Sequence, residues 1–321
     1  MVSCRRSLFA GLAVPLALVA LSVFSAGAAA ATVQSAPGAS SAVVRAAAGA
    51  LTTVVSATPS WRTPVLVDAV AGMPQAVSCV TARFCMAVDS YGNAMRFNGK
   101  LWTAPARVGP KNWALTAISC TSTTFCVALE PPTDHSSEPL AYIYNGTAWT
   151  TVPATGLGPD SNYSISCVTD SFCVAADSWG TVSKFDGRAW TAQGSLGFPD
   201  AYWVSCASST FCVAVSGIGA SVKYDGASWS PAGVIDDTTP NGSVSRSVSC
   251  TASTFCMAID GAGGVAVYNG LGWSQRSILD PKGQLYALSC ASAQFCAAIG
   301  ASGATTFNGS AWSQPVSIAQ Q

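Results

Sequence analysis

Twelve of the thirteen cysteines fall into six pairs, and the two members of each pair stand six positions apart. A pair of thiols can form a disulfide or bind a metal ion, but zinc-binding pairs usually stand two to four residues apart and converge on one ion. The wider spacing, the even number and the export signal described below favour disulfides and predict no metal site. The pairs are Cys79/Cys85, Cys120/Cys126, Cys167/Cys173, Cys206/Cys212, Cys250/Cys256 and Cys290/Cys296.

A second set of residues has the chemistry of a ligand-binding surface. Aromatic rings present an apolar face, and together with a few polar groups they suit stacking against sugars or other amphipathic ligands. Several of these residues stand four positions before the first cysteine of a pair, where the residue type varies from one pair to the next. The candidate ligand-binding residues are Tyr91, Trp113, His135, Tyr163, Trp179, Tyr202, Arg246 and Tyr286. The alternatives are that the tyrosines pack in the core and that His135, the only histidine, is a solvated loop residue.

Residues with the potential for catalysis are sparse. The single histidine leaves no distributed histidine chemistry, and no Gly-x-Ser-x-Gly nucleophile motif is present. Asp89, Glu130, Asp177 and Asp260 occupy equivalent places after a strand-like run, and hydrolysis of a glycoside would need two of them within about 5–10 Å. Aspartates at such places more often cap turns than bind ligands. We therefore predict no catalytic residues, no enzyme activity and no cofactor, and keep a glycan-active hydrolase or lyase as the less favoured alternative.

The elements that must position these residues form a sixfold repeat with steps of 39 to 47 residues. Each unit begins with an apolar-Ser-Cys strand, continues with a Phe-Cys strand such as "FCMAVD", and then has a third strand that ends in an aromatic residue followed by Asn-Gly or Asp-Gly. A fourth strand begins at a tryptophan, as at Trp102 in the first unit. Because Asn-Gly and Asp-Gly tolerate the positive φ angles of hairpin turns, strands three and four should be antiparallel neighbours.

Four-stranded units of this length, repeated around a ring, predict an all-β fold, the β-propeller, with one disulfide in each blade. We expect six blades. Trp61 begins "WRTPVLV", a seventh copy of the fourth strand, so the alternative is a degenerate seventh blade built from residues 42–67 and the C-terminus. In a propeller the loops between strands two and three share one face with the start of strand one, and the disulfide loops lie on the opposite face. The candidate residues therefore gather on one face.

The disulfides are expected to be structural. Each closes a short loop, and loop-entropy arguments give such a crosslink about 2 to 2.5 kcal/mol if it is unstrained. This value is substantial beside the roughly 5–15 kcal/mol that stabilises a typical domain. The crosslinks would stabilise a chain in which only 9% of residues are charged.

The Ser-Cys-x5-Cys units and the aromatic-[Asn/Asp]-Gly-x-x-Trp turns resemble those of secreted actinobacterial β-propeller repeat proteins, over about residues 61–316. More loosely, the unit is similar to the blades of tectonin-like propeller lectins, to the Asp-box repeats of sialidases and to quinoprotein blades. The first resemblance implies the fold and export but little chemistry. An Asp-box places its tryptophan much closer to the aspartate than Trp102 lies from Asp89, so no sialidase activity is carried over.

The N-terminal segment resembles an export signal. Arg5 and Arg6 precede an apolar run, and small residues follow it, so residues 1–31 are predicted to be a signal peptide. A retained membrane anchor is the alternative, although Pro15 interrupts the run. We expect residues 32–60 to form a low-complexity linker or N-terminal arm and residues 61–321 to form the propeller. Nothing after the signal is apolar for long enough to cross a bilayer.

Charge limits the classes of partner. The chain has 15 basic and 15 acidic residues, and removal of Arg5 and Arg6 with the signal leaves a net charge of −2. A chain so close to neutral, without basic clusters, argues against nucleic acid as a partner. The sequence therefore predicts a secreted or cell-surface binding module that recognises extracellular carbohydrate or cell-wall glycan. A protein–protein interaction scaffold is the alternative.

Overall fold

The computed structural model describes residues 72–109, 113–132, 138–159, 163–197, 203–235, 245–281 and 284–318. These residues form 23 β-strands. The strands of the first three repeats are β1 (Pro74–Thr81), β2 (Phe84–Asp89), β3 (Asn93–Phe97), β4 (Ala106–Arg107), β5 (Ala117–Ser122), β6 (Phe125–Glu130), β7 (Leu140–Tyr144), β8 (Trp149–Pro153), β9 (Tyr163–Thr169), β10 (Phe172–Asp177), β11 (Thr181–Phe185) and β12 (Trp190–Ser195). Those of the last three are β13 (Trp203–Ser208), β14 (Phe211–Val215), β15 (Ala220–Tyr224), β16 (Gly233–Val234), β17 (Ser245–Ala252), β18 (Phe255–Asp260), β19 (Gly264–Tyr268), β20 (Ser277–Ile278), β21 (Leu285–Ser292), β22 (Phe295–Gly300) and β23 (Gly303–Phe307).

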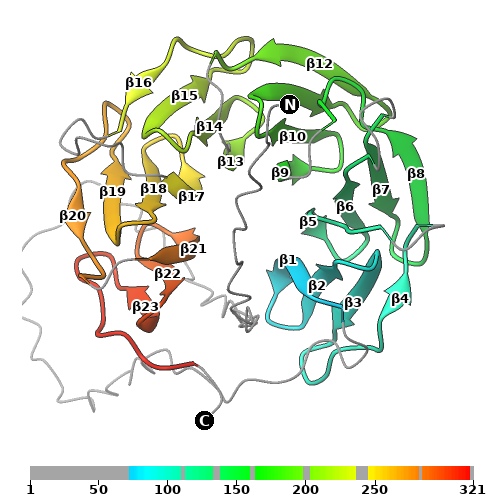
Figure 1. Cartoon of the computed structure of the whole chain (residues 1–321), viewed down its shortest axis with the longest axis horizontal. Coiled ribbons are helices and arrows are strands. Elements are labelled where there is room, and N and C mark those ends of the chain that lie inside the picture. The colour runs from blue at the N-terminus through cyan, green and yellow to red at the C-terminus, as the bar shows by residue number, and fades with distance from the viewer. Residues whose placement is uncertain are drawn as a thin grey trace, which may run out of the picture.

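Each repeat is one antiparallel sheet, and the six sheets are arranged as propeller blades around a common centre (Figure 1). The first five sheets have four strands, and the sixth has three. Beyond β23 the chain continues along this sheet through the isolated bridges Phe307–Trp312 and Ala304–Val316. The first strand of each sheet lies nearest the centre and the fourth lies at the rim. The prediction of an all-β propeller with six four-stranded repeats is confirmed, except that isolated bridges take the place of a fourth strand in the sixth sheet.

All six predicted disulfides are present. In every sheet the two cysteines are directly opposite each other in the first hairpin, and their Cα atoms are 3.9 to 4.0 Å apart. Each disulfide therefore links two strands that are already paired, and it closes the hairpin at the same end of every blade. The bonds are Cys79–Cys85, Cys120–Cys126, Cys167–Cys173, Cys206–Cys212, Cys250–Cys256 and Cys290–Cys296.

The second cysteine of each disulfide is also a core residue, which the sequence analysis did not predict. The analysis treated the pairs only as crosslinks of a hairpin at one face. From the second sheet to the sixth, however, the second cysteine also packs in the cluster toward the preceding blade. The sulfur atoms thus fill core volume in addition to crosslinking, and these six cysteines are not a surface site. The buried members are Cys85, Cys126, Cys173, Cys212, Cys256 and Cys296, all at most 1% exposed.

The turns between strands three and four use glycine and asparagine for different purposes. Gly99 has a φ of 94°, and the corresponding glycine of each other repeat also has positive φ. Asn98 does not. Its Oδ1 atom accepts hydrogen bonds from the backbone N–H groups of Lys100 and Leu101 at 2.9 Å. The predicted antiparallel pairing of these strands is confirmed, and the Asx cap explains why Asn or Asp precedes the glycine.

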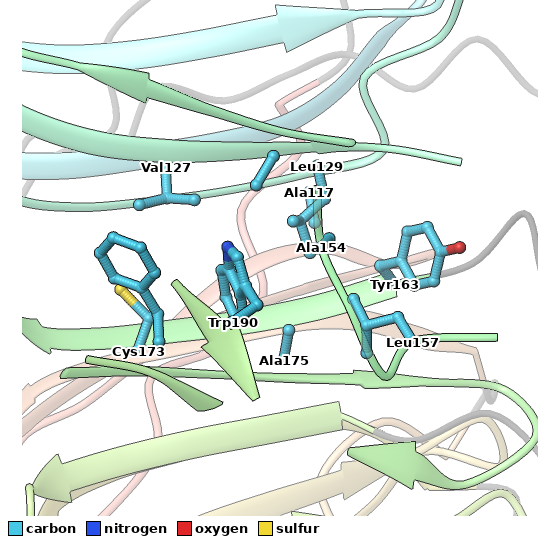
Figure 2. Close-up of a cluster of buried hydrophobic side chains, with 11 residues drawn as sticks. Ala117, Val127, Leu129, Ala154, Leu157, Tyr163, Cys173, Ala175 and Trp190 are labelled. Carbon is cyan, nitrogen blue, oxygen red and sulfur yellow. The ribbon is translucent and has the colours of Figure 1, made fainter. Parts of the chain in front are cut away.

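The core lies between neighbouring sheets rather than at the centre of the ring. Figure 2 shows the cluster between the second and third sheets, where Val127 and Leu129 pack against Cys173, Ala175 and Trp190. Similar clusters join the first sheet to the second, the third to the fourth, the fourth to the fifth and the fifth to the sixth. At these five interfaces, the face that carries the cysteines of one sheet packs on the opposite face of the preceding sheet.

A serine hydrogen bond accompanies each of these five interfaces. The serine of every Ser-Cys pair, from the first sheet to the fifth, accepts a hydrogen bond at Oγ from the backbone N–H of the first cysteine in the next sheet, at 2.9 Å. The bonds run from Cys120 to Ser78, Cys167 to Ser119, Cys206 to Ser166, Cys250 to Ser205 and Cys290 to Ser249. This explains the serine that the sequence repeats before each cysteine. Each of these hydrogen bonds joins the first strand of one blade to the first strand of the next.

The predicted signal peptide, the predicted linker and Trp61 all lie outside the described residues. Within the described ranges, no helix is long and apolar enough to cross a membrane.

Candidate functional site

The turns between the second and third strands of all blades lie on one face of the molecule, which we call the turn face. The strand register requires this, because the start of β1 pairs with the end of β2, with Pro74 opposite Asp89. The same arrangement holds for Leu285 opposite Gly300 in the sixth sheet. The disulfide hairpins close the other end of the strands. The turn face therefore carries the start of each first strand and the turn after each second strand, as predicted.

Aspartates at the ends of the second strands build these turns. The Asp89 Oδ1 atom accepts hydrogen bonds from the backbone N–H groups of Tyr91 and Asn93, both at 2.8 Å. Asp177 accepts equivalent bonds from Trp179 and Thr181, both at 2.9 Å. Both aspartates are fully buried. Their carboxylates hold the turn, which is the turn-capping role that the sequence analysis favoured over ligand binding.

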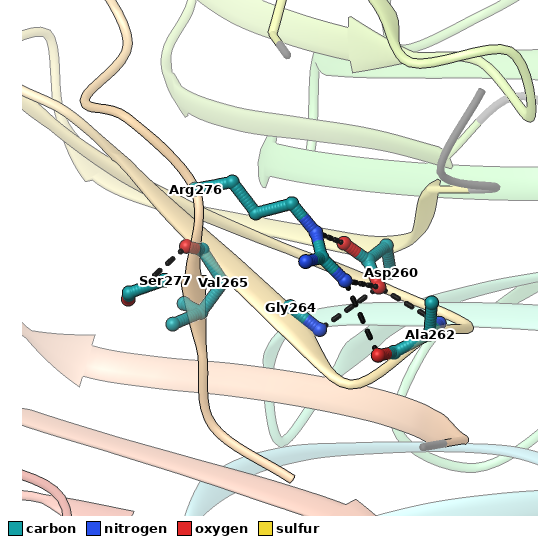
Figure 3. Close-up of polar contacts among 6 residues, drawn as sticks. All are labelled: Asp260, Ala262, Gly264, Val265, Arg276 and Ser277. Carbon is teal, nitrogen blue, oxygen red and sulfur yellow. Dashed lines mark hydrogen bonds and ion pairs between the residues drawn. The ribbon is translucent and has the colours of Figure 1, made fainter. Parts of the chain in front are cut away.

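The fifth blade strengthens the same turn with an ion pair (Figure 3). Asp260 Oδ1 accepts hydrogen bonds from the N–H groups of Ala262 and Gly264 at 2.8 Å, and Arg276 donates from Nε and Nη2 to the two carboxylate oxygens. Burial by itself would raise the pKa of Asp260, but the hydrogen bonds from Arg276 and the two backbone N–H groups outweigh it, so the pKa lies below its usual value. The ion pair is buried and structural.

Glu130, the acid at the equivalent position of the second blade, is also buried. The Tyr142 hydroxyl donates to its Oε2 atom at 2.8 Å, and burial together with the neighbouring carboxylate raises the pKa of Tyr142. The four acids that could have formed a catalytic pair thus lie buried in four separate sheets. Among the described residues there is no group of three or more His, Cys, Asp or Glu side chains that could hold a metal ion.

The tips of these turns carry exposed apolar side chains. The residue two positions after the capping side chain is Tyr91 in the first blade, Trp179 in the third and Ile218 in the fourth, and these side chains are 46%, 61% and 48% exposed. In the fourth blade Ser216 replaces the aspartate and accepts from the backbone N–H of Ala220 at 3.1 Å. The buried cap fixes the backbone, while the tip side chain is free to differ from blade to blade. Tyr91 and Trp179 are therefore exposed as the sequence predicted.

The residues four positions before the first cysteine divide according to strand geometry. β17 and β21 each have a register shift at this position, and Arg246 and Tyr286 point outward and are exposed there. The Tyr286 hydroxyl donates to Gln284 Oε1 at 2.8 Å. β9 pairs without a shift at this point. Tyr163 consequently turns inward, is buried in the cluster between the second and third sheets, and donates from its hydroxyl to the Gly158 carbonyl at 2.6 Å. Tyr163 belongs to the core and not to the exposed set.

The remaining predicted residues, Trp113, His135 and Tyr202, add no exposed side chain to the described turn face. Trp113 is half-buried, and His135 and Tyr202 lie outside the described residues. Two exposed side chains at the same face were not predicted. Ile218 occupies the tip position in a turn that lacks the aspartate, and Met73, 65% exposed, directly precedes β1. The position of Ile218 in the repeat, equivalent to that of Tyr91 and Trp179, would have identified it, but the candidates were chosen for aromatic or polar side chains. The described turn face thus displays Met73, Tyr91, Trp179, Ile218, Arg246 and Tyr286.

Comparison with solved structures identifies β-propellers. A structure of YCF48 bound to D1 peptide superposes with a TM-score of 0.58 at 15% identity, covering 78% of this chain and 82% of that one. YCF48 from Cyanidioschyzon merolae gives a TM-score of 0.55 at 11% identity, covering 78% and 86%. The WD40 β-propeller domain of Doa1 gives 0.58 at 11% identity, covering 76% and 82%. These likenesses support the fold alone.

No protein-family model and no curated protein sequence matches the chain. The resemblance to secreted actinobacterial repeat proteins therefore stays a prediction.

Proposed function

We propose that this protein is an extracellular binding module that holds an extended carbohydrate, such as a cell-wall glycan, across its turn face. The observation that carries the proposal is the exposure of two large aromatic side chains, Tyr91 and Trp179, on turns whose backbone is fixed by buried aspartates. Exposed aromatic rings on a rigid frame lose little conformational entropy when they stack against a sugar ring.

The distribution of the aromatic residues favours a long ligand. Tyr91, Trp179 and Tyr286 belong to the first, third and sixth sheets, so a ligand that contacts more than one of them must extend across several blades. Arg246, exposed in the fifth sheet, supplies hydrogen-bond donors for hydroxyl or carboxylate groups of such a ligand. The capping carboxylates already accept hydrogen bonds from the turns. The residues that contact the carbohydrate are therefore those at the tips of the turns and at the starts of the first strands.

The six disulfides support an oxidising compartment as the place where the protein works. Secretion through cleavage of residues 1–31 accords with this chemistry. Six crosslinks in one chain would be reduced or left unformed in the reducing interior of most cells.

A polypeptide ligand is the second candidate, and two side chains favour it. Met73 and Ile218 are exposed on the same face and have no polar tip, which suits the apolar contacts of a protein partner. In addition, YCF48, a protein with a similar fold, has been solved with D1 peptide bound.

A binding screen separates these candidates. The oxidised protein would be tested against an array of cell-wall polysaccharides and, in parallel, against an array of peptides. Saturable binding to a polysaccharide, competed by the same polysaccharide in solution, is the expected result. Binding confined to peptides would replace the glycan proposal with the polypeptide one. Absence of binding on both arrays would refute the proposal of a ligand-binding turn face.

A further inference from the structure

Two exposed side chains of opposite chemistry stand at the starts of neighbouring inner strands. Arg246 and Tyr286 occupy equivalent positions of the fifth and sixth blades, and their strands, β17 and β21, lie next to each other (Figure 1). A register shift at each position turns the side chain outward. Bulges of this kind are over-represented next to active sites, where they redirect a side chain. The two residues therefore form a pair on the turn face.

The guanidinium group of Arg246 lies over Gly261, the first residue of the turn after β18. A β-carbon at Gly261 would stand 2.8 Å from Arg246 Nε and 3.4 Å from Arg246 Cζ. A larger residue at this position would therefore displace the guanidinium group. The glycine allows the charged end of Arg246 to rest on the turn rather than extend away from it.

The surroundings leave the charge of Arg246 without a partner of opposite sign. The described fifth and sixth blades contain two acidic residues, Asp260 and Asp280, and both are buried. Asp260 is paired with Arg276, and Asp280 accepts a hydrogen bond from Ser302 Oγ at 2.9 Å. No ion pair joins Arg246 to another residue of the described ranges. An exposed guanidinium in this state can bind a carboxylate or a phosphate through two parallel hydrogen bonds.

Gln284 connects the arginine site to Tyr286. It has a φ of 71°, the one positive value outside glycine among the described residues. Its backbone N–H donates to the Gly261 carbonyl at 2.9 Å, and its Oε1 atom accepts from the Tyr286 hydroxyl at 2.8 Å. A left-handed backbone at a residue other than glycine is strained, and such residues cluster at active sites and ligand clamps. Gln284 thus ties the Tyr286 ring to the turn on which Arg246 rests.

We propose that the carbohydrate of the turn face is acidic, with Arg246 binding its carboxylate or phosphate group and the ring of Tyr286 stacking against the adjoining sugar. This inference rests on the proposed function and adds the charge of the ligand to it. Gln284 acts as a positioning residue, because it holds the ring through its side chain and the turn through its backbone. An acidic glycan supplies the oxyanion that Arg246 lacks, whereas a neutral glycan does not.

Isothermal titration calorimetry with matched polysaccharides tests the proposal. The probes are polygalacturonate, the same polymer after chemical reduction of its carboxyl groups, and a glycerol phosphate polymer. The oxidised native protein should bind one of the two acidic polymers at least about tenfold more tightly than the reduced polymer, which is the factor expected for a hydrogen bond to a charged group. The two acidic polymers distinguish carboxylate from phosphate as the oxyanion.

Variants separate the charge of Arg246 from its position. Arg246→Gln should abolish the preference for the acidic polymer and change the affinity for the reduced polymer little. Gly261→Ala keeps every charge but displaces the guanidinium group, so it should also reduce the preference. Arg83→Gln removes an exposed arginine from the disulfide hairpin of the first blade, and this matched control should retain the preference. Tyr286→Ala should weaken the binding of acidic and reduced polymers alike.

Two results would overturn this inference while the proposed function stands. The first is binding of neutral polysaccharides without a preference for either acidic polymer. The second is a preference for an acidic polymer that survives Arg246→Gln or is lost in Arg83→Gln. Absence of binding to any polysaccharide would instead refute the proposed function, and this inference with it. A preference for the phosphate polymer that Arg246→Gln abolishes would support the inference, with phosphate as the oxyanion.

Discussion

The serine hydrogen bonds between blades allow a sharp test of the architecture. Ser166→Ala removes the hydroxyl that accepts from the Cys206 N–H at 2.9 Å, between two inner strands. The N–H group would be left in a half-buried interface without its acceptor, and an unpaired buried donor costs about 1–3 kcal/mol. We therefore expect Ser166→Ala to lower the free energy of unfolding by this amount, with the disulfides intact.

Ser289→Ala is the matched control. It changes the same residue type at the same position of the repeat, but the Ser289 hydroxyl is exposed and accepts no such bond from a described sheet. An exposed substitution of this kind usually changes stability by no more than about 0.5 kcal/mol. Denaturant unfolding of both oxidised variants, followed by tryptophan fluorescence, measures the difference. Equal losses in the two variants, or no loss in Ser166→Ala, would refute the role assigned to the serine.

Further predictions concern the crosslinks and the fifth blade. Replacing Cys206 and Cys212 together by serine should cost at least about 2 kcal/mol of unfolding free energy, from the restored freedom of the unfolded chain, and an unchanged denaturation midpoint would contradict this. Arg276→Met leaves the buried Asp260 carboxylate without its partner and should cost about 3–5 kcal/mol, whereas Arg188→Met, at an exposed turn, should be near neutral; similar midpoints for the two would be the contrary result. Because the pKa of Asp260 is lowered in the fold, its stabilising contribution is complete above the unfolded value of 3.8 and is lost as the pH falls through the folded value. Acid unfolding followed by circular dichroism should show this loss in the native protein, and Arg276→Met should reduce it.

Much of the fold could be predicted because the repeat carries its own strand boundaries. The cysteine pair marks the first hairpin. The fourth strand begins at the tryptophan, as predicted, in the second and third blades, whereas Trp102 and the other equivalents form isolated bridges outside the named strands. The serine before each cysteine was visible in the sequence, but its bond to the next blade was not. That bond depends on how neighbouring sheets are placed, and spacing along the chain does not report it. The burial of the second cysteine, as at Cys126, depends on the same packing of blades.

The candidate site was predicted less completely. Tyr163 and Tyr286 stand at the same position relative to their cysteines, yet one is buried and the other exposed. A register shift at the start of β21, absent from β9, decides the direction of the side chain. A one-residue shift moves a side chain to the other face of a strand, and nothing in the local sequence of Tyr163 signals its absence. The exposure of Tyr91 and Trp179 was predictable because the aspartate two residues earlier fixes the turn.

The central claim is that the turn face binds the ligand, and an affinity comparison on that face tests it most directly. The double variant Tyr91→Ala and Trp179→Ala would be compared with Leu101→Ala and Leu271→Ala, whose side chains are 72% and 93% exposed in turns at the disulfide end. The probe is the polysaccharide that binds best in the screen, measured by isothermal titration calorimetry. Loss of two aromatic contacts should weaken binding at least roughly tenfold, which corresponds to about 1.4 kcal/mol, and the leucine variant should bind as the native protein does. Unchanged affinity in the aromatic variant, or an equal loss in the leucine variant, would contradict the assignment of the turn face.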